Sequence, residues 1–238
     1  MSKRPNSAVS QDDVMPEAPL AADHVTQLRA AVLSRCSADC LSACSSIMGA
    51  GVSRNDLFDH YIPAVAHVLG TDWSRDKISF AATTMGVVRL QWLLRALEPA
   101  PDPGMDRDVP GILILVPAGE HHTLGAVLLS TQLRRRGFCV SLMLEARPDA
   151  IARRMRGTSF QATMISTSPG PHNRDLRALV TASRRVMEND APVLIGGTIA
   201  QEDIDLKDLS GADHVTVDAE EALALCDLRL KDRVAETI

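Results

Sequence analysis

The chain has 238 residues, of which 45% are apolar, and its 30 acidic and 25 basic side chains give a net charge of −5. With only four Phe, two Trp and one Tyr it has few rings for stacking on single-stranded bases, and its acidity disfavours a protein that coats DNA through phosphate contacts. No apolar run approaches the roughly 18 to 20 residues that cross a bilayer, so we expect a soluble, cytoplasmic protein with no membrane partner.

The first part of the chain is predicted to be helical. Residues 1–20 are rich in Ser, Pro and Asp without periodicity and predict a disordered arm. Residues 21–98 carry helical periodicity in four segments, which predicts a four-helix bundle. Ser53 and Ser74 are the predicted N-caps of the third and fourth helices. On the fourth helix we expect an apolar stripe to pack against something, formed by Ile78, Ala81, Met85, Val88 and Trp92.

In the second part of the chain the hydrophobic periodicity changes. Residues 99–110 are rich in Pro and Gly and predict a linker. Within residues 111–238, short apolar runs alternate with amphipathic helical stretches, which predicts a five-stranded, doubly wound, flavodoxin-like parallel sheet with ligands at the carboxyl ends of its strands. The predicted strands are 112–118, 138–144, 162–168, 192–198 and 213–217.

The loop after the first predicted strand carries the chemistry. It contains Glu-x-His-x-x-Gly, with Glu120, His122 and Gly125 in register. Ser166 follows Gly125 by 41 residues, and 27 residues separate Ser168 from the Gly196-Gly197 pair. Because these features all fall at carboxyl ends of predicted strands, we expect them to line a single crevice.

This spacing resembles that of the cobalamin-binding domain, whose pattern is Asp-x-His-x-x-Gly, then Ser-x-Leu, then Gly-Gly at similar intervals. The resemblance implies that His122 displaces the dimethylbenzimidazole of the cofactor and ligates cobalt from below. Glu120 would orient the imidazole through its other nitrogen. Ser166, Gly196 and Gly197 would line the slot for the nucleotide tail.

Two residues depart from the family pattern. Glu120 stands where most members have Asp, and it keeps the carboxylate with one more methylene. Ser168 stands where they have Leu, and we expect it to make the tail pocket more polar. Thr123 and Gly125 of the histidine loop complete the expected cofactor contacts in this domain.

The helical part resembles a particular kind of cap. Residues 68–97 look like the cap of the PpaA/AerR regulators of purple photosynthetic bacteria, and more distantly that of the light-dependent CarH repressors. The resemblance implies that the neighbourhood of Trp73 covers the upper face of the corrin. Thr83 and Thr84 stand where the CarH pattern has a Glu-His pair, so an upper histidine ligand would have to come from elsewhere.

PpaA/AerR-like proteins are implied to be antirepressors rather than enzymes. The resemblance implies that this chain binds adenosyl- or hydroxocobalamin, responds to light, and acts on a partner repressor of photosystem genes. Contact with DNA would be indirect, since the sequence offers no convincing helix-turn-helix beside the cap. Two alternatives stay open: a corrinoid carrier protein of a methyltransferase system, and a haem or redox sensor on the same scaffold.

Simpler roles compete at several positions. His122 could be a capping or core histidine, Glu120 an anion near a helix N-terminus, and the glycine pair a tight turn. His121 is expected to face solvent. Solvated or packed roles are also favoured over ligand roles for three other groups: Cys36, Cys40 and Cys44; His60 and His67; and the arginines at 134–136 and 153–156.

Overall fold

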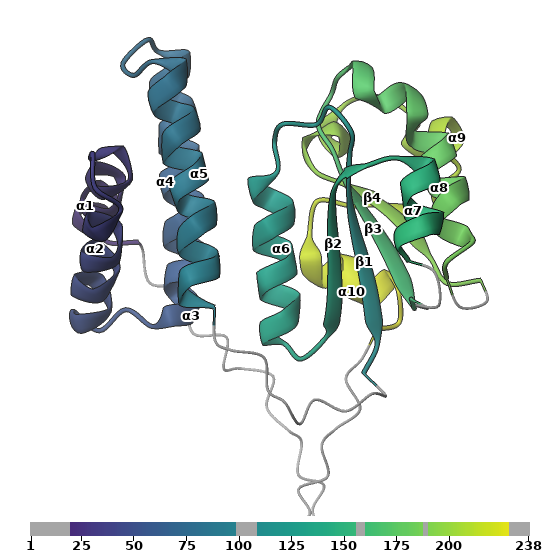
Figure 1. Ribbon diagram of the computed structural model, residues 1–238, viewed down its shortest axis with the longest axis horizontal. Helices are drawn as coiled ribbons and strands as arrows, with labels where there is room; N and C mark the ends of the chain where they lie inside the picture. Colours follow the sequence, from purple (N-terminus) through teal and green to yellow (C-terminus); the bar gives the residue numbers. More distant parts are fainter. Residues whose placement is uncertain (1–19, 99–108, 156–159, 188–189, 229–238) are drawn as a thin grey trace, which may run out of the picture.

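A computed structural model describes residues 20–98, 109–155, 160–187 and 190–228. Almost all of the predicted arm and of the predicted linker lies outside these residues. Helices of the cap come first (Figure 1): α1 (Ala22–Leu33), α2 (Ser37–Gly49), α3 (Arg54–Asp56), α4 (Ile62–Ser74) and α5 (Phe80–Leu97). The strands that follow are β1 (Gly111–Pro117), β2 (Cys139–Ala146), β3 (Ala162–Ser166), β4 (Val193–Gly196) and β5 (His214–Val215). Their helices are α6 (Leu124–Arg135), α7 (Pro148–Arg154), α8 (Leu176–Arg184), α9 (Leu206–Ser210) and α10 (Ala219–Leu225).

The third helical segment contains a π-helical turn. Helices α3 and α4 are joined without a break by η1 (Leu57–Tyr61), so the cap has the four helical segments expected from periodicity. Ile62 N–H donates to Leu57 O, one residue further back than in an α-helix, just before Pro63, which has no N–H. Ser53 caps the segment as predicted, because its Oγ accepts from Asp56 N–H at 3.0 Å.

The predicted start of the fourth helix is wrong. Helix α4 continues to Ser74, whose Oγ donates to the helical carbonyl of Thr71 at 2.9 Å instead of capping a new helix. The chain then turns through Asp76, where φ is 54°. Helix α5 begins at Phe80 because Ser79 Oγ accepts from Ala82 N–H at 3.2 Å.

Four residues of the stripe expected to pack are exposed, whereas Ile78, which precedes α5, is partly buried against the core of the cap. Met85 and Val88 are each 51% exposed, and Trp92 is 38% exposed. The adjacent face is buried instead, because Gly86 allows Leu69 of α4 to come so close that a Cβ at Gly86 would lie 2.8 Å from Leu69 Cδ1. The buried residues of α5 are Gly86, Leu90, Leu93 and Leu94.

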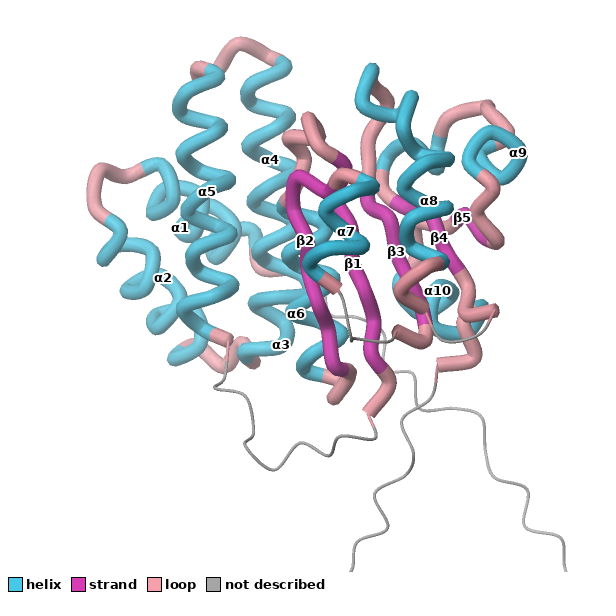
Figure 2. The backbone as a smooth tube through the Cα atoms, turned by 45° about the vertical axis from the view of Figure 1, so that its right-hand side comes forward, coloured by secondary structure: helices cyan, strands magenta, loops and turns pink. Residues whose placement is uncertain are grey.

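The sheet has the predicted flavodoxin-like order β2-β1-β3-β4-β5, and every pair is parallel. Successive residues of β1 alternate between two apolar clusters, as the period of a strand requires. Ile112 and Ile114 pack with residues of α6 and α10, whereas Leu113 and Leu115 pack with residues of α7 and α8. The sheet is therefore covered on both faces, with helices on either side of the strands (Figure 2).

Helix α6 belongs to both parts of the molecule. Val127 of α6 is buried in the same apolar cluster as the cap residues, whereas Ala126 and Leu133 face the sheet. Polar contacts join the C-terminal end of α6 to the cap, across the seam between the two parts. Gln132 Nε2 donates to Asp59 Oδ1 at 2.9 Å, and the guanidinium of Arg135 lies 4.9 Å from the centre of the Phe58 ring. The core of the cap thus includes a side chain of α6, the first helix of the second predicted domain.

Cys40 and Cys44 have the packing role expected of them, whereas Cys36 is exposed. Cys40 and Cys44 are buried in the cap, and burial raises the pKa of the Cys44 thiol to about 12. Arginines 134–136 pair with the carboxylates of Glu98, Asp59 and Glu220 respectively. Arg134 and Arg136 are solvated as expected, but the side chain of Arg135 is only 13% exposed. None of the helices in the described ranges combines the length and apolar character needed to cross a membrane.

Candidate cofactor site

The loop between β1 and α6 buries one functional side chain and exposes another. Strand β1 ends at Pro117, and Gly119 takes a left-handed φ of 82° that favours glycine. Glu120 N–H then closes a turn onto Pro117 O at 3.1 Å. As a result the side chain of Glu120 is fully buried, whereas that of His122 is 81% exposed. A core role for His122 is therefore excluded.

The buried carboxylate of Glu120 fixes the imidazole. Its Oε1 accepts from His122 N–H at 2.6 Å and lies 2.9 Å from His122 Nδ1. Its Oε2 accepts from both the backbone N–H and the Oγ of Ser168, each at 2.6 Å. Since a carboxylate only accepts, Nδ1 of His122 carries a proton, and in the neutral ring Nε2 is then the nitrogen with the lone pair.

Glu120 is held in its ionised form. Burial of the carboxyl group works to raise its pKa, but hydrogen bonds from Ser168 and His122 outweigh burial and lower the pKa from 4.5 to about 2. A full negative charge therefore lies beside Nδ1 of the imidazole, and a carboxylate in this position orients a histidine that binds a metal through its other nitrogen.

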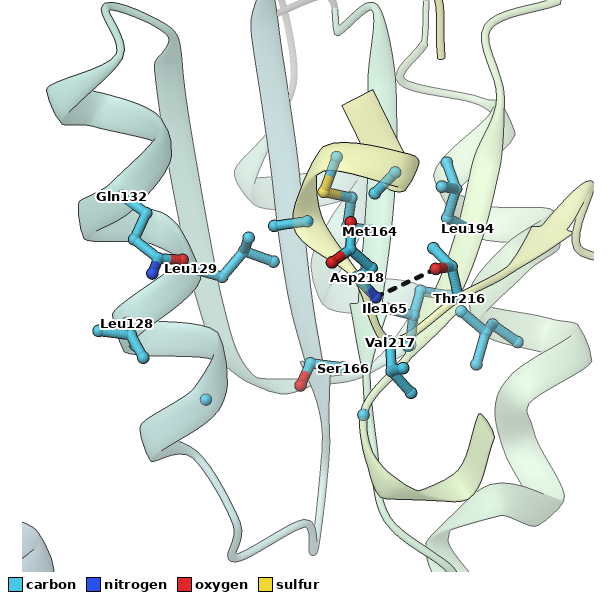
Figure 3. A pocket seen from close by; sticks show the side chains of 16 residues that line it. Leu128, Leu129, Gln132, Met164, Ile165, Ser166, Leu194, Thr216, Val217 and Asp218 are labelled. Carbon is cyan, nitrogen blue, oxygen red and sulfur yellow. Dashed lines mark hydrogen bonds between the residues drawn. The ribbon is translucent and has the colours of Figure 1, made fainter. Parts of the chain in front are cut away.

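A pocket of about 250 Å³ opens beside this loop, between α6 and the sheet. Gly125, three residues after His122, forms part of its wall. Ser166 lies between α6 and the segment Thr216–Asp218 (Figure 3). The walls are mostly apolar, with polar groups from Gln132, Ser166, Thr216 and Asp218. Gly125, Ser166, Gly196 and Gly197 thus line one cavity, but Glu120 and His122, which were expected in the same crevice, are not among its lining residues.

The glycine pair also serves the backbone. A Cβ on Gly196 would lie 2.8 Å from Thr216 O, and a Cβ on Gly197 would lie 2.3 Å from Thr167 O. Gly197 also has a φ of 90°. Neighbouring backbone atoms therefore occupy the space that a side chain at either glycine would need, which agrees with the tight-turn alternative. Both glycines also line the pocket.

The expectation for Ser168 is wrong. The tail pocket was expected to become more polar through Ser168, but that residue is 7% exposed beneath Glu120, and the residues that line the pocket do not include it. It lies beyond the last residue of β3, where the chain bends towards the histidine loop.

Thr123 and Trp73 connect the site with the cap. Thr123 Oγ1 accepts from Gln91 Nε2 of α5 at 2.7 Å, which joins the cap to the residue next to His122. Trp73 is 48% exposed at the end of α4, and its ring centre lies 6.0 Å from that of Phe80. The α4–α5 turn and the β1–α6 loop lie at the same end of the molecule (Figure 1). Cofactor contact by Trp73 stays a prediction.

Sequence reasoning missed His172, Thr167 and Asn173. His172 Nε2 lies 3.1 Å from Glu120 Oε2, and Asn173 Nδ2 donates to Ser168 O at 2.8 Å. The available signal was weak: these residues follow the third strand and so belong to the same edge of the sheet as the histidine loop.

The donor set suits a metal that brings its own equatorial ligands. No cluster of three or more His, Cys, Asp or Glu side chains placed to hold an ion occurs in the described ranges. One exposed imidazole with an anionic partner, near a mostly apolar pocket, instead fits the axial position of a metal macrocycle.

Comparison with known proteins gives three similarities. Residues 110–227 match the model of the B12 binding domain family. The chain is 34% identical over 172 residues to an uncharacterised 20.5 kDa protein of Rhodobacter capsulatus from the bchF–crtJ intergenic region, covering 71% of this chain and 89% of that protein. The monomethylamine corrinoid protein of Methanosarcina barkeri superposes with a TM-score of 0.64 at 17% identity, over 86% of this chain and 98% of that one, which shows a shared fold.

Proposed function

Because the chain belongs to the B12 binding domain family, we propose that it is a cobalamin-dependent regulator of transcription that acts on a partner repressor of photosystem genes. The observation that carries the proposal is the pairing of exposed His122 with buried, ionised Glu120. Its regulatory part is supported by the relative from a photosynthesis gene region.

The residues of the site fit cobalamin bound with its benzimidazole displaced. His122 Nε2 would be the lower axial ligand of cobalt, and the pocket beside Gly125 and Ser166 would take the nucleotide tail. When bound, the cofactor supplies a cobalt centre whose upper ligand light or redox chemistry can exchange. The protein's part is to hold the imidazole proton on Nδ1 and to keep Glu120 ionised.

The hydrogen bond between Gln91 and Thr123 gives the cap a direct link to the ligand loop. A shift of His122 on ligand exchange would move Thr123, its neighbour in sequence, and would strain or release the contact with α5. Because α6 shares its apolar core with the cap, the seam between the two parts is the element whose closure the cofactor would bias.

The assignment of His122 is tested by replacing it with alanine and recording absorption spectra with hydroxocobalamin. We expect the His122→Ala protein to lose the spectrum of imidazole-ligated cobalamin and to bind the cofactor 10-fold to 100-fold more weakly. His121→Ala is the control, since the adjacent ring is exposed and makes no contact with Glu120 among the described interactions. Equal spectra for wild type and His122→Ala would show that another group is the ligand.

The regulatory role is tested with the partner repressor and its photosystem promoter. We expect the cobalamin-loaded protein to change the repressor's affinity for DNA, with different strengths before and after illumination, and His122→Ala to abolish that difference. A methyltransferase carrier would instead exchange a methyl group at cobalt with a methyl donor and leave repressor binding unchanged. A spectrum of haem rather than corrin would overturn both readings.

The tail pocket gives an independent prediction. A Cβ at Gly125 would have no atom within 4 Å, so Gly125→Leu should fold normally while its side chain fills the pocket. We expect cobalamin affinity to fall at least 10-fold, because the nucleotide tail loses its space. Cobinamide, which has no nucleotide tail, should bind wild type and variant equally. Equal losses for both corrinoids in titrations would place the tail elsewhere.

A further inference from the structure

We propose that the exposed face of α5 is the docking surface for a partner protein, which presents an amphipathic helix with acidic residues beside its own apolar face. This surface, the α5 stripe, consists of Ala81, Met85, Val88 and Trp92, all of which are exposed. The inference rests on the proposed function in one respect, since the partner that a regulator needs is taken to be the protein that docks here. The first part of its test requires neither cobalamin nor the repressor.

The α5 stripe lies on a face of the helix that neither the cap nor α6 covers. Leu90 faces the core of the cap and is fully buried. Gln91 faces α6, because its Nε2 donates to Thr123 Oγ1 at 2.7 Å. Successive residues of an α-helix are about 100° apart, so the stripe points away from the core and to one side of α6. A contiguous apolar surface of this kind is typical of an interaction site.

The spacing of the α5 stripe is that of a helix–helix interface. Its four residues follow one another at intervals of four, three and four residues, which is the spacing of the a and d positions of a coiled coil. Met85 is an unbranched side chain that adapts to the shape of a partner, and Trp92 is of the type that most often anchors an interface. The pattern therefore favours a helix as the occupant of this face.

A hollow of about 380 Å³ adjoins the stripe, between the end of α1 and the first half of α5. Val32 and Leu33 of α1 and Met85 of α5 form apolar parts of its lining. Arg35 and Arg89 add two guanidinium groups to the same hollow. It therefore offers room for one large apolar side chain of a docked helix, next to two positive charges.

The charges around the stripe select the kind of helix that docks. Helix α5 contains Arg89 and Arg95 but no Asp or Glu. Neither of these residues nor Arg35 forms an ion pair with a carboxylate in the part of the chain that the structure describes. Acidic residues beside the apolar face of a docked helix would pair with these arginines, whereas α5 of a second copy would set arginine against arginine. Charge complementarity thus favours an acidic partner over a second copy.

Two synthetic helical peptides test the chemistry of the partner. Both carry leucine at a and d positions, and the flanking positions are glutamate in one and lysine in the other. The full-length Trp73→Phe protein is used because its remaining tryptophan, Trp92, then reports binding. We expect the glutamate peptide to shift the emission of Trp92 to shorter wavelength and to bind about 10-fold more tightly than the lysine peptide. Arg95→Glu should remove this preference.

Charges placed in the stripe test its location. Val88→Glu and Met85→Glu alter side chains that are already half exposed, so both proteins should fold. Leu41→Glu is the matched control, because it makes the same kind of change at an exposed position of α2. We expect the first two variants to bind the glutamate peptide about 10-fold more weakly or worse, and Leu41→Glu to bind it as wild type does.

The same variants connect the stripe with regulation. In the assay with the repressor and its promoter, cobalamin-loaded Val88→Glu should lose its effect on the repressor while it keeps the wild-type hydroxocobalamin spectrum and affinity. Leu41→Glu should keep all three properties. A wild type without effect on the repressor would refute the proposed function, whereas the peptide titrations would still decide the docking surface.

Several results would overturn the inference. Equal affinities for the two peptides would remove the role of charge, and equal behaviour of Val88→Glu and Leu41→Glu would remove the role of the stripe. A wild-type dimer in sedimentation that Val88→Glu dissociates would assign the stripe to a second copy, and weaker hydroxocobalamin binding by Val88→Glu would assign it to the cofactor. Should Val88→Glu fail to fold, Met85→Glu gives the same comparisons.

Discussion

Replacing Glu120 with alanine is expected to destabilise the cofactor-free protein by about 3 kcal/mol or more, because the buried N–H and Oγ of Ser168 and the N–H of His122 lose their acceptor. Urea unfolding of the two proteins measures this loss. The same variant should bind hydroxocobalamin 10-fold to 100-fold more weakly, since nothing then fixes the proton of His122 on Nδ1. Glu120→Asp restores the charge one methylene short, and should lie between the two in both measurements.

The stabilising effect of Glu120 should also depend on pH. Its pKa in the folded protein is about 2, below the ordinary 4.5, so the ionised form favours folding. This contribution, of about 3 kcal/mol, is complete above pH 4.5 and is lost as the pH falls towards 2.

Glu120→Gln is the matched control for this pH dependence. It is a neutral isostere that offers an N–H group where only acceptors fit, so it should be less stable than wild type at pH 7. The difference in the free energy of unfolding between the two proteins should shrink as the pH falls from 5 to 2. A difference that stays constant over this range would mean that folding does not lower the pKa of Glu120.

The fold was predicted from hydrophobic patterns within single helices and strands. Short apolar runs separated by amphipathic stretches predicted five parallel strands in the observed order, because burial on both faces leaves a continuous apolar signature. The pattern could not decide which face of α5 is buried. Apolar residues occur on two faces of that helix, and the close contact at Gly86 with Leu69 is a property of the assembled cap.

The site was predictable where it is local in sequence. Glu120 and His122 lie in one turn, so their spacing already indicates a carboxylate beside an imidazole. Ser168 and His172 reach the same carboxylate only because the chain after β3 bends back through Gly170. That path depends on packing around glycines, and neither periodicity nor motif spacing encodes it.

Gly197→Ala should be among the most destabilising single changes in the α/β part. The added Cβ would lie 2.3 Å from Thr167 O and 2.9 Å from Thr167 N, both backbone atoms that have no rotamer with which to move away. The left-handed φ of 90° adds strain for any residue with a Cβ. Overpacking and backbone strain together predict a loss of about 2 to 4 kcal/mol.

Two other glycines separate the causes of this loss in urea unfolding. Gly51 has a φ of 100° but nothing within 4 Å of an added Cβ, so Gly51→Ala should show strain alone, about 1 kcal/mol. Gly49 ends α2 with no such φ and no close neighbour, so Gly49→Ala should cost nothing. Relief of the clash would displace Thr167 and, with it, Ser168, whose N–H donates to Glu120. Gly197→Ala should therefore also weaken cobalamin binding. If Gly197→Ala cost no more than Gly51→Ala, the close approach of Thr167 would be wrong, and the glycine pair would serve the cofactor rather than the fold.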